Sequence, residues 1–173
     1  MNKNGLTKDN FELGSLDADA ENELTYKQIL VPIDFSEQSR RSVSYAARFA
    51  SRYNATLQLL HVLEIPDYSL AHRQYRPESA DRHKPELDAA EDDARENLAA
   101  IEDQLRNRGN KVETYLRVGC PFDEIVQMAK HLGVDLIILG SRGLTGLKHL
   151  LLGSTAERVV EHARCPVLVV KEP

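Results

Sequence analysis

The stretch Q-I-L-V-P-I-D-F-S, residues 28–36, decides the fold class of this chain. Its first six residues, Gln28–Ile33, form a nearly continuous apolar run, which is typical of a strand covered on both faces. Asp34-Phe35-Ser36 then opens an amphipathic helical pattern that ends at Asn54. A buried strand that leads directly into a helix is the unit of an α/β protein.

The same alternation continues along the chain. Further strands are predicted over residues 56–63, 111–118, 135–140 and 167–171, and further helices over 86–108, from Pro121 to Gly133, and from Ser154 to about His162. Strands that alternate with helices pack as a parallel sheet. The sequence therefore predicts a single-domain α/β fold: a doubly wound five-stranded parallel sheet with helices on both faces.

Two segments do not follow the alternation. Residues 1–24 carry two lysines against six carboxylates, a net charge of −4, and lack apolar periodicity, which predicts a disordered N-terminal extension before a domain over 25–173. Residues 64–85 contain three prolines and resist regular assignment. A connection of this length is either a lid or binding loop, or an exposed insertion.

Composition narrows the class of protein. The whole chain of 173 residues has a net charge of −5, so the predicted domain is nearly neutral and lacks the basic patch of a nucleic-acid binder. Its longest apolar runs are too short to cross a bilayer, and no apolar signal segment opens the chain. Cys120 and Cys165 show no metal-ligand spacing and are expected to be buried thiols. We expect a cytoplasmic protein without membrane insertion or nucleic-acid partner.

A glycine-rich segment follows the predicted strand 135–140, at the edge of the sheet where open parallel sheets bind ligands. Gly140, Gly143 and Gly153 can adopt positive φ and lack side chains, so a ligand can approach the backbone closely. Ser154 and Glu157 have the spacing of a capping box at a helix N-terminus, which favours phosphate. The alternative is a tight loop followed by an ordinary N-cap.

Several groups near this segment could add to a phosphate site. Thr155 offers a hydroxyl, and Arg142 or Lys148 could supply positive charge. The segment is neither a Walker A loop nor the dinucleotide fingerprint, because neither GxxxxGK[ST] nor a GxGxxG after the first strand occurs. Any nucleotide is therefore expected to be held by a different arrangement.

Residues 26–171 resemble a universal stress protein domain. The resemblance rests on the opening 29–36, on Leu59-Leu60-His61-Val62, and on G-x2-G-x9-G-[ST], which is met by Gly140, Gly143, Gly153 and Ser154. This motif marks the ATP-binding branch of that family. The resemblance implies an adenine nucleotide alpha hydrolase-like fold that binds ATP or AMP, with Mg²⁺ carried by the phosphates.

The resemblance also implies a set of nucleotide-binding residues. Asp34 would contact the ribose or adenine side, Val62 would lie by the adenine, and residues 153–155 would complete the phosphate pocket. Family members often carry Thr where this chain has Ile33, so a hydroxyl contact is lost there. The full implied set is Pro32, Ile33, Asp34, Val62, Leu139, Gly140, Arg142, Gly143, Gly153, Ser154 and Thr155.

A homodimer through antiparallel pairing of the last strand, Val167–Val170, is implied as well, and an apolar edge strand is compatible with it. Three functions remain open: a regulatory nucleotide-binding module, a slow ATPase or phosphotransferase, and a nucleotide-free dimeric scaffold. Hydrolysis needs a group that orients water. No catalytic residue is evident; His149, inside the glycine-rich segment, is the one histidine to test, and the others are expected to be solvated or packed. Binding is favoured over catalysis.

Overall fold

The computed structural model describes residues 25–64, 84–143 and 152–171. The predicted extension 1–24, most of the connection 64–85, and the candidates Lys148 and His149 lie outside these ranges. The strands are β1 (Gln28–Ile33), β2 (Thr56–Leu63), β3 (Lys111–Val118), β4 (Leu136–Gly140) and β5 (Val167–Val170). The helices are α1 (Glu37–Tyr53), α4 (Lys84–Arg106), α5 (Pro121–Leu132) and α6 (Ser154–His162).

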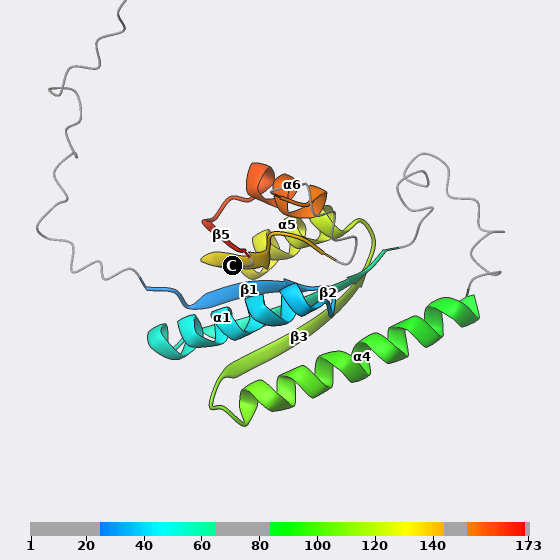
Figure 1. Cartoon of the computed structure of the whole chain (residues 1–173), viewed down its shortest axis with the longest axis horizontal. Coiled ribbons are helices and arrows are strands. Elements are labelled where there is room, and N and C mark those ends of the chain that lie inside the picture. Colours follow the sequence, from blue (N-terminus) through cyan, green and yellow to red (C-terminus); the bar gives the residue numbers. More distant parts are fainter. Residues whose placement is uncertain (1–24, 65–83, 144–151, 172–173) are drawn as a thin grey trace, which may run out of the picture.

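The five strands form one parallel sheet in the order β3-β2-β1-β4-β5 (Figure 1). β1 lies at its centre, where Ile29 is paired with Leu57 of β2 on one side and Leu136 of β4 on the other. The chain winds outward from β1 to β3, and then returns to place β4 on the opposite side of β1. The predicted doubly wound parallel sheet is confirmed, and its topological switch point lies between β1 and β4.

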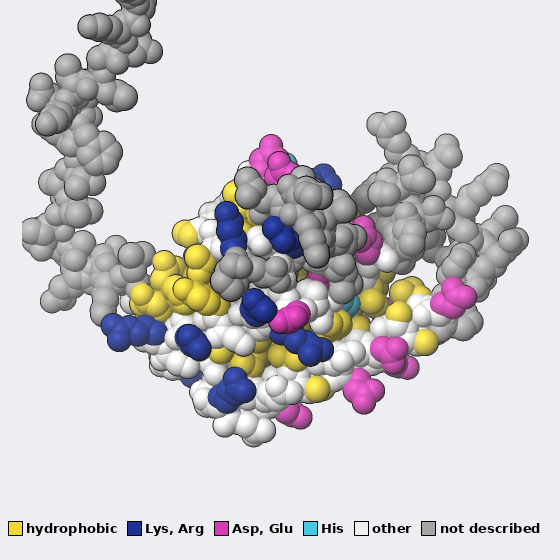
Figure 2. Space-filling model, in the orientation of Figure 1, with side chains coloured by type: hydrophobic (Ala, Val, Ile, Leu, Met, Phe, Trp, Pro, Cys, Tyr) yellow, Lys and Arg dark blue, Asp and Glu magenta, His cyan; other side chains and the backbone are white. Residues whose placement is uncertain are grey.

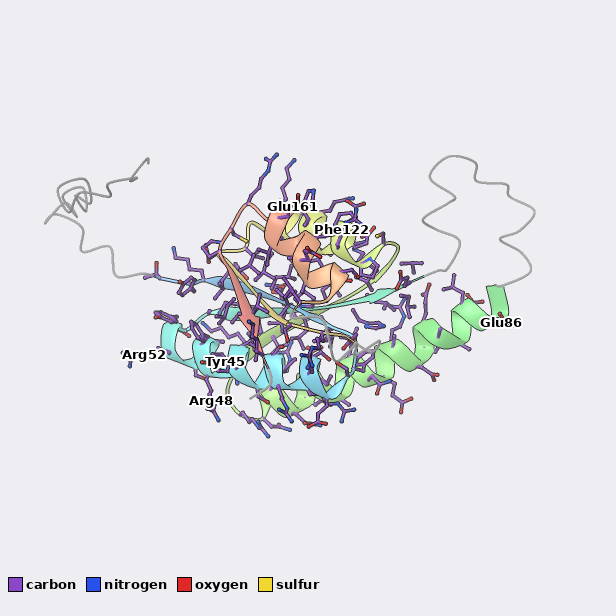
Figure 3. The ribbon with its side chains drawn as sticks, turned by 45° about the horizontal axis from the view of Figure 1, so that its top comes forward. Tyr45, Arg48, Arg52, Glu86, Phe122 and Glu161 are labelled. Carbon is purple, nitrogen blue, oxygen red and sulfur yellow. The ribbon has the colours of Figure 1, made fainter. Side chains whose placement is uncertain are left out.

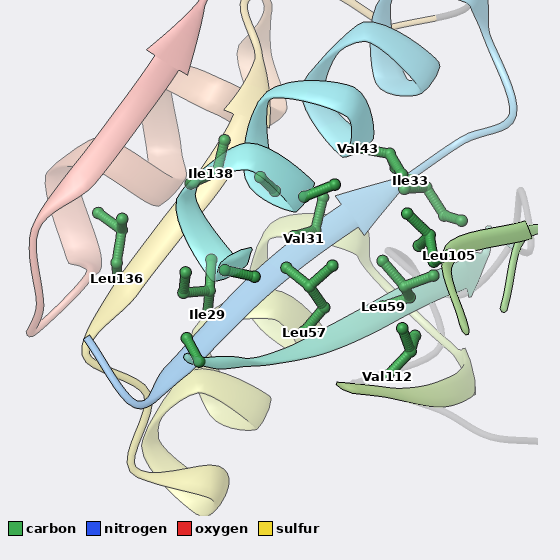
Figure 4. Packing of buried hydrophobic residues seen from close by; sticks show 14 of the residues in the cluster. Ile29, Val31, Ile33, Val43, Leu57, Leu59, Leu105, Val112, Leu136 and Ile138 are labelled. Atoms are coloured by element: carbon green, nitrogen blue, oxygen red, sulfur yellow. The ribbon is translucent and has the colours of Figure 1, made fainter. Parts of the chain in front are cut away.

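Two helices cover each face of the sheet (Figure 1). α1 and α4 pack against one face, over a core in which alternate strand residues such as Val31 and Leu59 meet Val43 of α1 and Leu105 of α4 (Figure 4). α5 and α6 pack against the other face around Leu30 and Leu60. Because both faces are covered, the central strands are apolar at nearly every position, as their sequences predict.

The helix ends follow the expected local chemistry. The Ser36 hydroxyl caps α1 by accepting the Ser39 N–H at 3.1 Å, and Asn54 ends it with a left-handed φ of 54°. Pro121 occupies the first turn of α5, and Gly133 ends that helix in the left-handed region. The predicted bounds of the helix 86–108 and of the strands 135–140 and 167–171 were each wrong by one or two residues, which is the usual uncertainty at element ends.

β3 is an edge strand and, as its alternating sequence predicts, is less completely covered than the central strands. The Tyr115 hydroxyl donates to Glu113 at 2.8 Å on this edge. Partial burial, and then the neighbouring carboxylate, raise the pKa of Tyr115 to about 12. Within the described residues, no helix has the length and apolar character needed to cross a membrane.

Candidate functional site

A cavity of about 450 Å³ opens at the carboxyl ends of β1, β2 and β4. All eleven residues of the implied set line it, although they come from four separate parts of the sequence. β1 and the turn after it supply Pro32, Ile33 and Asp34, and β2 supplies Val62. The rest come from the end of β4 and the start of α6. The switch point of the sheet therefore brings the predicted residues together.

The turn between β1 and α1 fixes Asp34 at the cavity wall. The Ser36 N–H donates to Asp34 Oδ1 at 3.0 Å, which forms a tight Asx turn. Phe35, between them, adopts a positive φ of 61°, an uncommon conformation for a bulky residue. The short step from strand to helix therefore depends on the Asp34 carboxylate, which the turn holds in place.

His61 of β2 contacts this turn through Ile33 and Phe35. Its Nδ1 lies 2.8 Å from the Ile33 carbonyl oxygen, and because a carbonyl only accepts, Nδ1 carries the proton. The ring packs on Phe35 with centroids 4.3 Å apart, and only 9% of the residue is exposed. The packing role predicted for the histidines is confirmed here. The contribution of His61 to the cavity was missed, since no local sequence signal pairs it with Phe35.

The three motif glycines act through their missing side chains. They do not use the positive φ that glycine allows, because among the described glycines only Gly109 and Gly133 adopt it. A Cβ at Gly143 would lie 2.8 Å from Asp34 Oδ2, closer than van der Waals contact allows. A Cβ at Gly140 would lie 3.3 Å from the Arg142 carbonyl oxygen, whereas one at Gly153 would meet nothing nearer than 3.5 Å. Gly143 is therefore the position where a side chain conflicts most directly with the site.

The N-terminus of α6 faces the same cavity. The predicted capping box was wrong: Gly153 is the N-cap, no side chain caps the helix, and Ser154 is its exposed first residue. The Gly153 carbonyl accepts the Glu157 N–H at 2.9 Å, and the Gly153 N–H is used by the Ser141 carbonyl. Within the described residues, the N–H groups of residues 154–156 have no acceptor. The uncapped helix end therefore presents free N–H donors, the arrangement that binds anions.

Backbone contacts anchor the loop after β4. The Ser141 N–H donates to the Val170 carbonyl at 2.9 Å, and the Arg142 N–H donates to Gln38 Oε1 of α1 at 3.0 Å. Arg142 is half-buried and lines the cavity. It is the one guanidinium among the described lining residues, so it supplies positive charge close to the α6 N-terminus.

Other lining residues were not predicted, among them Ser39, Glu64, Pro121 and Ile125. They belong to the start of α1, the end of β2 and the start of α5, and their sequence neighbourhoods show only ordinary cap and core patterns. In the part of the chain that the structure describes, no three His, Cys, Asp or Glu side chains are grouped as metal ligands.

The two cysteines are half-buried, so the expectation of buried thiols was wrong. Desolvation, and then the charge of Asp135, raise the pKa of the Cys165 thiol. A raised pKa lowers the reactivity of a thiol, because the thiolate is the reactive form.

Comparison with known protein families shows which family the chain belongs to. The profile described as "Universal stress protein family" matches residues 25–171, and the chain belongs to this family. Universal stress protein MJ0531 from Methanocaldococcus jannaschii is 34% identical over 86% of this chain and 84% of its own length. Universal stress protein YxiE from Bacillus subtilis is 34% identical over 84% of this chain and 99% of its own length.

Solved structures of the family superpose well on this chain. MJ0577, whose archaeal source is also M. jannaschii, has 35% identity and a TM-score of 0.73, with 87% of this chain and 99% of its own covered. UspA from Lactobacillus plantarum has 30% identity and the same TM-score, with coverages of 84% and 98%. A universal stress protein crystallised in complex with cAMP has 25% identity and a TM-score of 0.60, with coverages of 86% and 99%.

Proposed function

We propose that this protein is an adenine nucleotide-binding module that binds ATP or AMP at the carboxyl edge of its sheet. The observation that carries the proposal is the convergence of the eleven implied residues on one cavity of about 450 Å³. Small-molecule sites in proteins have volumes of about 300–1,000 Å³, so a nucleotide fits this space. That a family member at 25% identity was crystallised with cAMP supports an adenine nucleotide over other phosphate ligands.

The two ends of the cavity differ in chemistry and match the two ends of a nucleotide. The side near Val62 and Pro32 is apolar and suits the base, and Asp34 offers carboxylate oxygens that can accept ribose hydroxyls. The other side holds the free N–H groups of α6 and the Arg142 guanidinium, which suit phosphates. Mg²⁺ would be carried by the phosphates of ATP, whose negative charge it would partly neutralise.

Binding is better supported than catalysis. Phosphoryl transfer needs a positioned base and several cationic groups around the transferred phosphate. Among the described lining residues, His61 Nδ1 is committed to the Ile33 carbonyl and Arg142 is the one cation. We therefore propose a regulatory role in which nucleotide occupancy is the signal.

The test is a calorimetric titration of the full chain with Mg²⁺-ATP, AMP and, as a base control, GTP, combined with mass spectrometry of small molecules released from untreated protein. Asp34→Ala is expected to weaken ATP binding about tenfold or more, since a charge-assisted hydrogen bond contributes about 1.5–3 kcal/mol. Asp103→Ala, on the exposed side of α4, is the matched control and should bind like the wild type.

If the wild type binds neither nucleotide, or if Asp34→Ala binds as well as Asp103→Ala, the cavity is not a nucleotide site and the scaffold function is favoured. Single-turnover hydrolysis with radiolabelled ATP separates the remaining two functions. A first-order burst of product that depends on the protein would favour the slow ATPase over the binding module.

We also propose that the protein forms a homodimer through β5. This strand lies at one edge of the sheet and is only half-buried along its four residues. Apolar edge strands are usually covered or paired, and pairing with a second copy would satisfy the outward N–H and C=O groups.

A further inference from the structure

The outer surface of α1 carries a row of arginines that the nucleotide site does not use. Arg41, Tyr45, Arg48 and Arg52 follow each other at intervals of four, three and four residues, which places them on one side of the helix. All four are exposed, and Figure 3 labels three of them along the outer side of α1. We call these four residues, together with Arg40, the arginine face of α1. Figure 2 shows dark blue side chains gathered over this helix.

Positive charge on this face is largely unbalanced. α1 contains four arginines and one carboxylate, Glu37, which forms an ion pair with Arg41 at 2.7 Å. Within the described residues, Arg40, Arg48 and Arg52 form no ion pair. Arg48 and Arg52 are also four residues apart, a spacing at which like charges destabilise a helix. An acidic partner on this face would remove that repulsion.

The face is hollowed as well as charged. Side chains of its first three turns surround a shallow depression of about 270 Å³, with Tyr45 as its aromatic wall. The depression is open to solvent. An extended chain segment fits such a groove better than a compact ligand does.

The first described residues of the domain lie against the C-terminal end of α1. Tyr26 packs edge-on against Phe49 and Tyr53 of α1, with ring centroids 6.2 Å and 5.0 Å apart. Phe49 in turn stacks on Tyr45 at 6.0 Å. The chain that precedes Tyr26 therefore joins the domain at the last turn of α1, next to Arg52.

The residues before Tyr26 carry the negative charges that could balance the arginine face. Residues 17, 19, 21 and 23 are Asp, Asp, Glu and Glu, so every second residue is acidic. In an extended chain, alternate residues point to the same side. From residue 17 to residue 23 such a chain spans about 20 Å, and the 11-residue separation of Arg41 and Arg52 spans about 16 Å of helix. The two rows of charges are therefore opposite in sign and similar in length.

We propose that residues 17–23 dock in cis along the arginine face of α1, with Glu23 beside Arg52 and Asp17 towards Arg41. The docked segment covers Arg48 and Arg52, which form no ion pair with the described residues, and the Tyr26 contacts set its direction. It is an addition to the family domain, whose profile match begins at residue 25. The interaction is independent of the nucleotide cavity, so it stands or fails separately from the proposed function.

The test is limited proteolysis of the full chain with a glutamate-specific protease, because Glu21 and Glu23 are cleavage sites inside the proposed contact. The free peptide of residues 1–27 provides the undocked rate. Cleavage in the wild type is expected to be about fivefold slower than in the peptide, since exposed ion pairs contribute about 0.2–1 kcal/mol each. Arg48→Gln/Arg52→Gln should cleave at the peptide rate, as should the wild type at about 0.5 M salt, where charges are screened.

Lys130→Gln/Arg164→Gln is the matched control, because both side chains are exposed and lie at the end of α5 and just after α6, the helices that cover the opposite face of the sheet from α1. It should keep the wild-type protection. Equal cleavage of the wild type and the peptide would overturn the proposal, and so would equal loss of protection in the two double variants. Protection that increases with protein concentration would place the segment on a second copy and also overturn docking in cis.

A spectroscopic measurement checks the same contact without a protease. In ¹⁵N-labelled full chain, Glu21→Gln/Glu23→Gln should shift the amide signals of α1 between Tyr45 and Tyr53, and should leave those of α5 unchanged. If the amide signals of α1 do not shift, or if those of α5 shift equally, docking on α1 is contradicted. Circular dichroism of each variant confirms that the fold is retained.

Discussion

The substitution Gly143→Ala tests whether the motif glycines act by leaving room for Asp34. A Cβ at position 143 would lie 2.8 Å from Asp34 Oδ2, so the carboxylate must move. Asp34 cannot move freely, because its other oxygen accepts the Ser36 N–H in the Asx turn. Displacement therefore either breaks that hydrogen bond or turns the carboxylate away from the cavity.

The expected effect is on binding and much less on folding. Loss of one charge-assisted hydrogen bond to the ligand costs about 1.5–3 kcal/mol, which weakens nucleotide binding by about tenfold to a hundredfold. The backbone at Gly143 is not left-handed, so alanine brings no conformational strain. Its lower unfolded-state entropy offsets part of the lost contact, and the free energy of unfolding should change by less than about 1 kcal/mol.

Gly153→Ala is the matched control, since it adds the same methyl group to the same loop. Its Cβ would meet no protein atom nearer than 3.5 Å and would leave Asp34 in place, so nucleotide binding should be weakened much less than in Gly143→Ala. It does place alanine at the N-cap of α6, and this costs about 0.5–1 kcal/mol of stability. Gly143→Ala should therefore lose binding and keep its stability, whereas Gly153→Ala should lose stability and keep most of its binding.

Calorimetry with Mg²⁺-ATP and urea unfolding, carried out on both variants, measure the two quantities. The reasoning is refuted if Gly143→Ala binds like the wild type, or if both variants lose binding equally. Equal loss would mean that the loop tolerates no side chain at either position, and that the contact with Asp34 is not what the glycine protects.

Three further outcomes follow from other contacts. His61→Phe keeps an aromatic ring against Phe35 but leaves the Ile33 carbonyl without its donor. Urea unfolding should therefore show a free energy of unfolding that is lower by about 1–3 kcal/mol, and an unchanged value would show that the hydrogen bond is dispensable. Because the pKa of Tyr115 is raised from 10.0 to about 12 in the folded state, the stability linked to its neutral form is complete below pH 10 and is lost as the pH rises from 10 to 12. Unfolding measured across that window should show a smaller decline in Tyr115→Phe than in the wild type, and parallel declines would contradict the shift. Val169→Pro should convert the proposed dimer to a monomer in light scattering, while Val169→Thr should keep the dimer. The carbonyls of residues 166 and 170 face β4, so the backbone groups of residues 167 and 169 face outward, and proline removes the outward N–H of residue 169. A dimeric proline variant would exclude β5 pairing.

Much of the fold could be predicted because local signals agree with the tertiary structure. Gln28–Ile33 is apolar at nearly every position since helices cover both faces of β1, and the stops at Asn54 and Gly133 are set by backbone conformation alone. The order of the strands was not predicted from the sequence. The pairing of β1 with β4 brings the ends of the first and fourth strands side by side, as a ligand site at a switch point requires.

The details of the site could not be predicted in the same way, because they depend on distances between residues far apart in sequence. Ser154 and Glu157 have the spacing of a capping box, yet the Gly153 carbonyl already accepts the Glu157 N–H and makes Gly153 the N-cap. Nothing in the sequence reports that Gly143 lies against Asp34, 109 positions earlier. A glycine in a loop usually indicates backbone freedom, but here the requirement for glycine comes from a carboxylate in the turn after β1.

This difference changes what the glycine motif means physically. If the glycines served backbone conformation, each would be replaceable only by a residue that tolerates positive φ, and the three positions would respond alike. Since none of them is left-handed, their importance is graded by what surrounds each one. Gly143 protects the Asp34 carboxylate, Gly140 lies close to the Arg142 carbonyl, and Gly153 leaves the α6 N–H groups without a competing side-chain cap. The motif thus describes a surface kept bare for a ligand, and the unequal effects of single alanines are its signature.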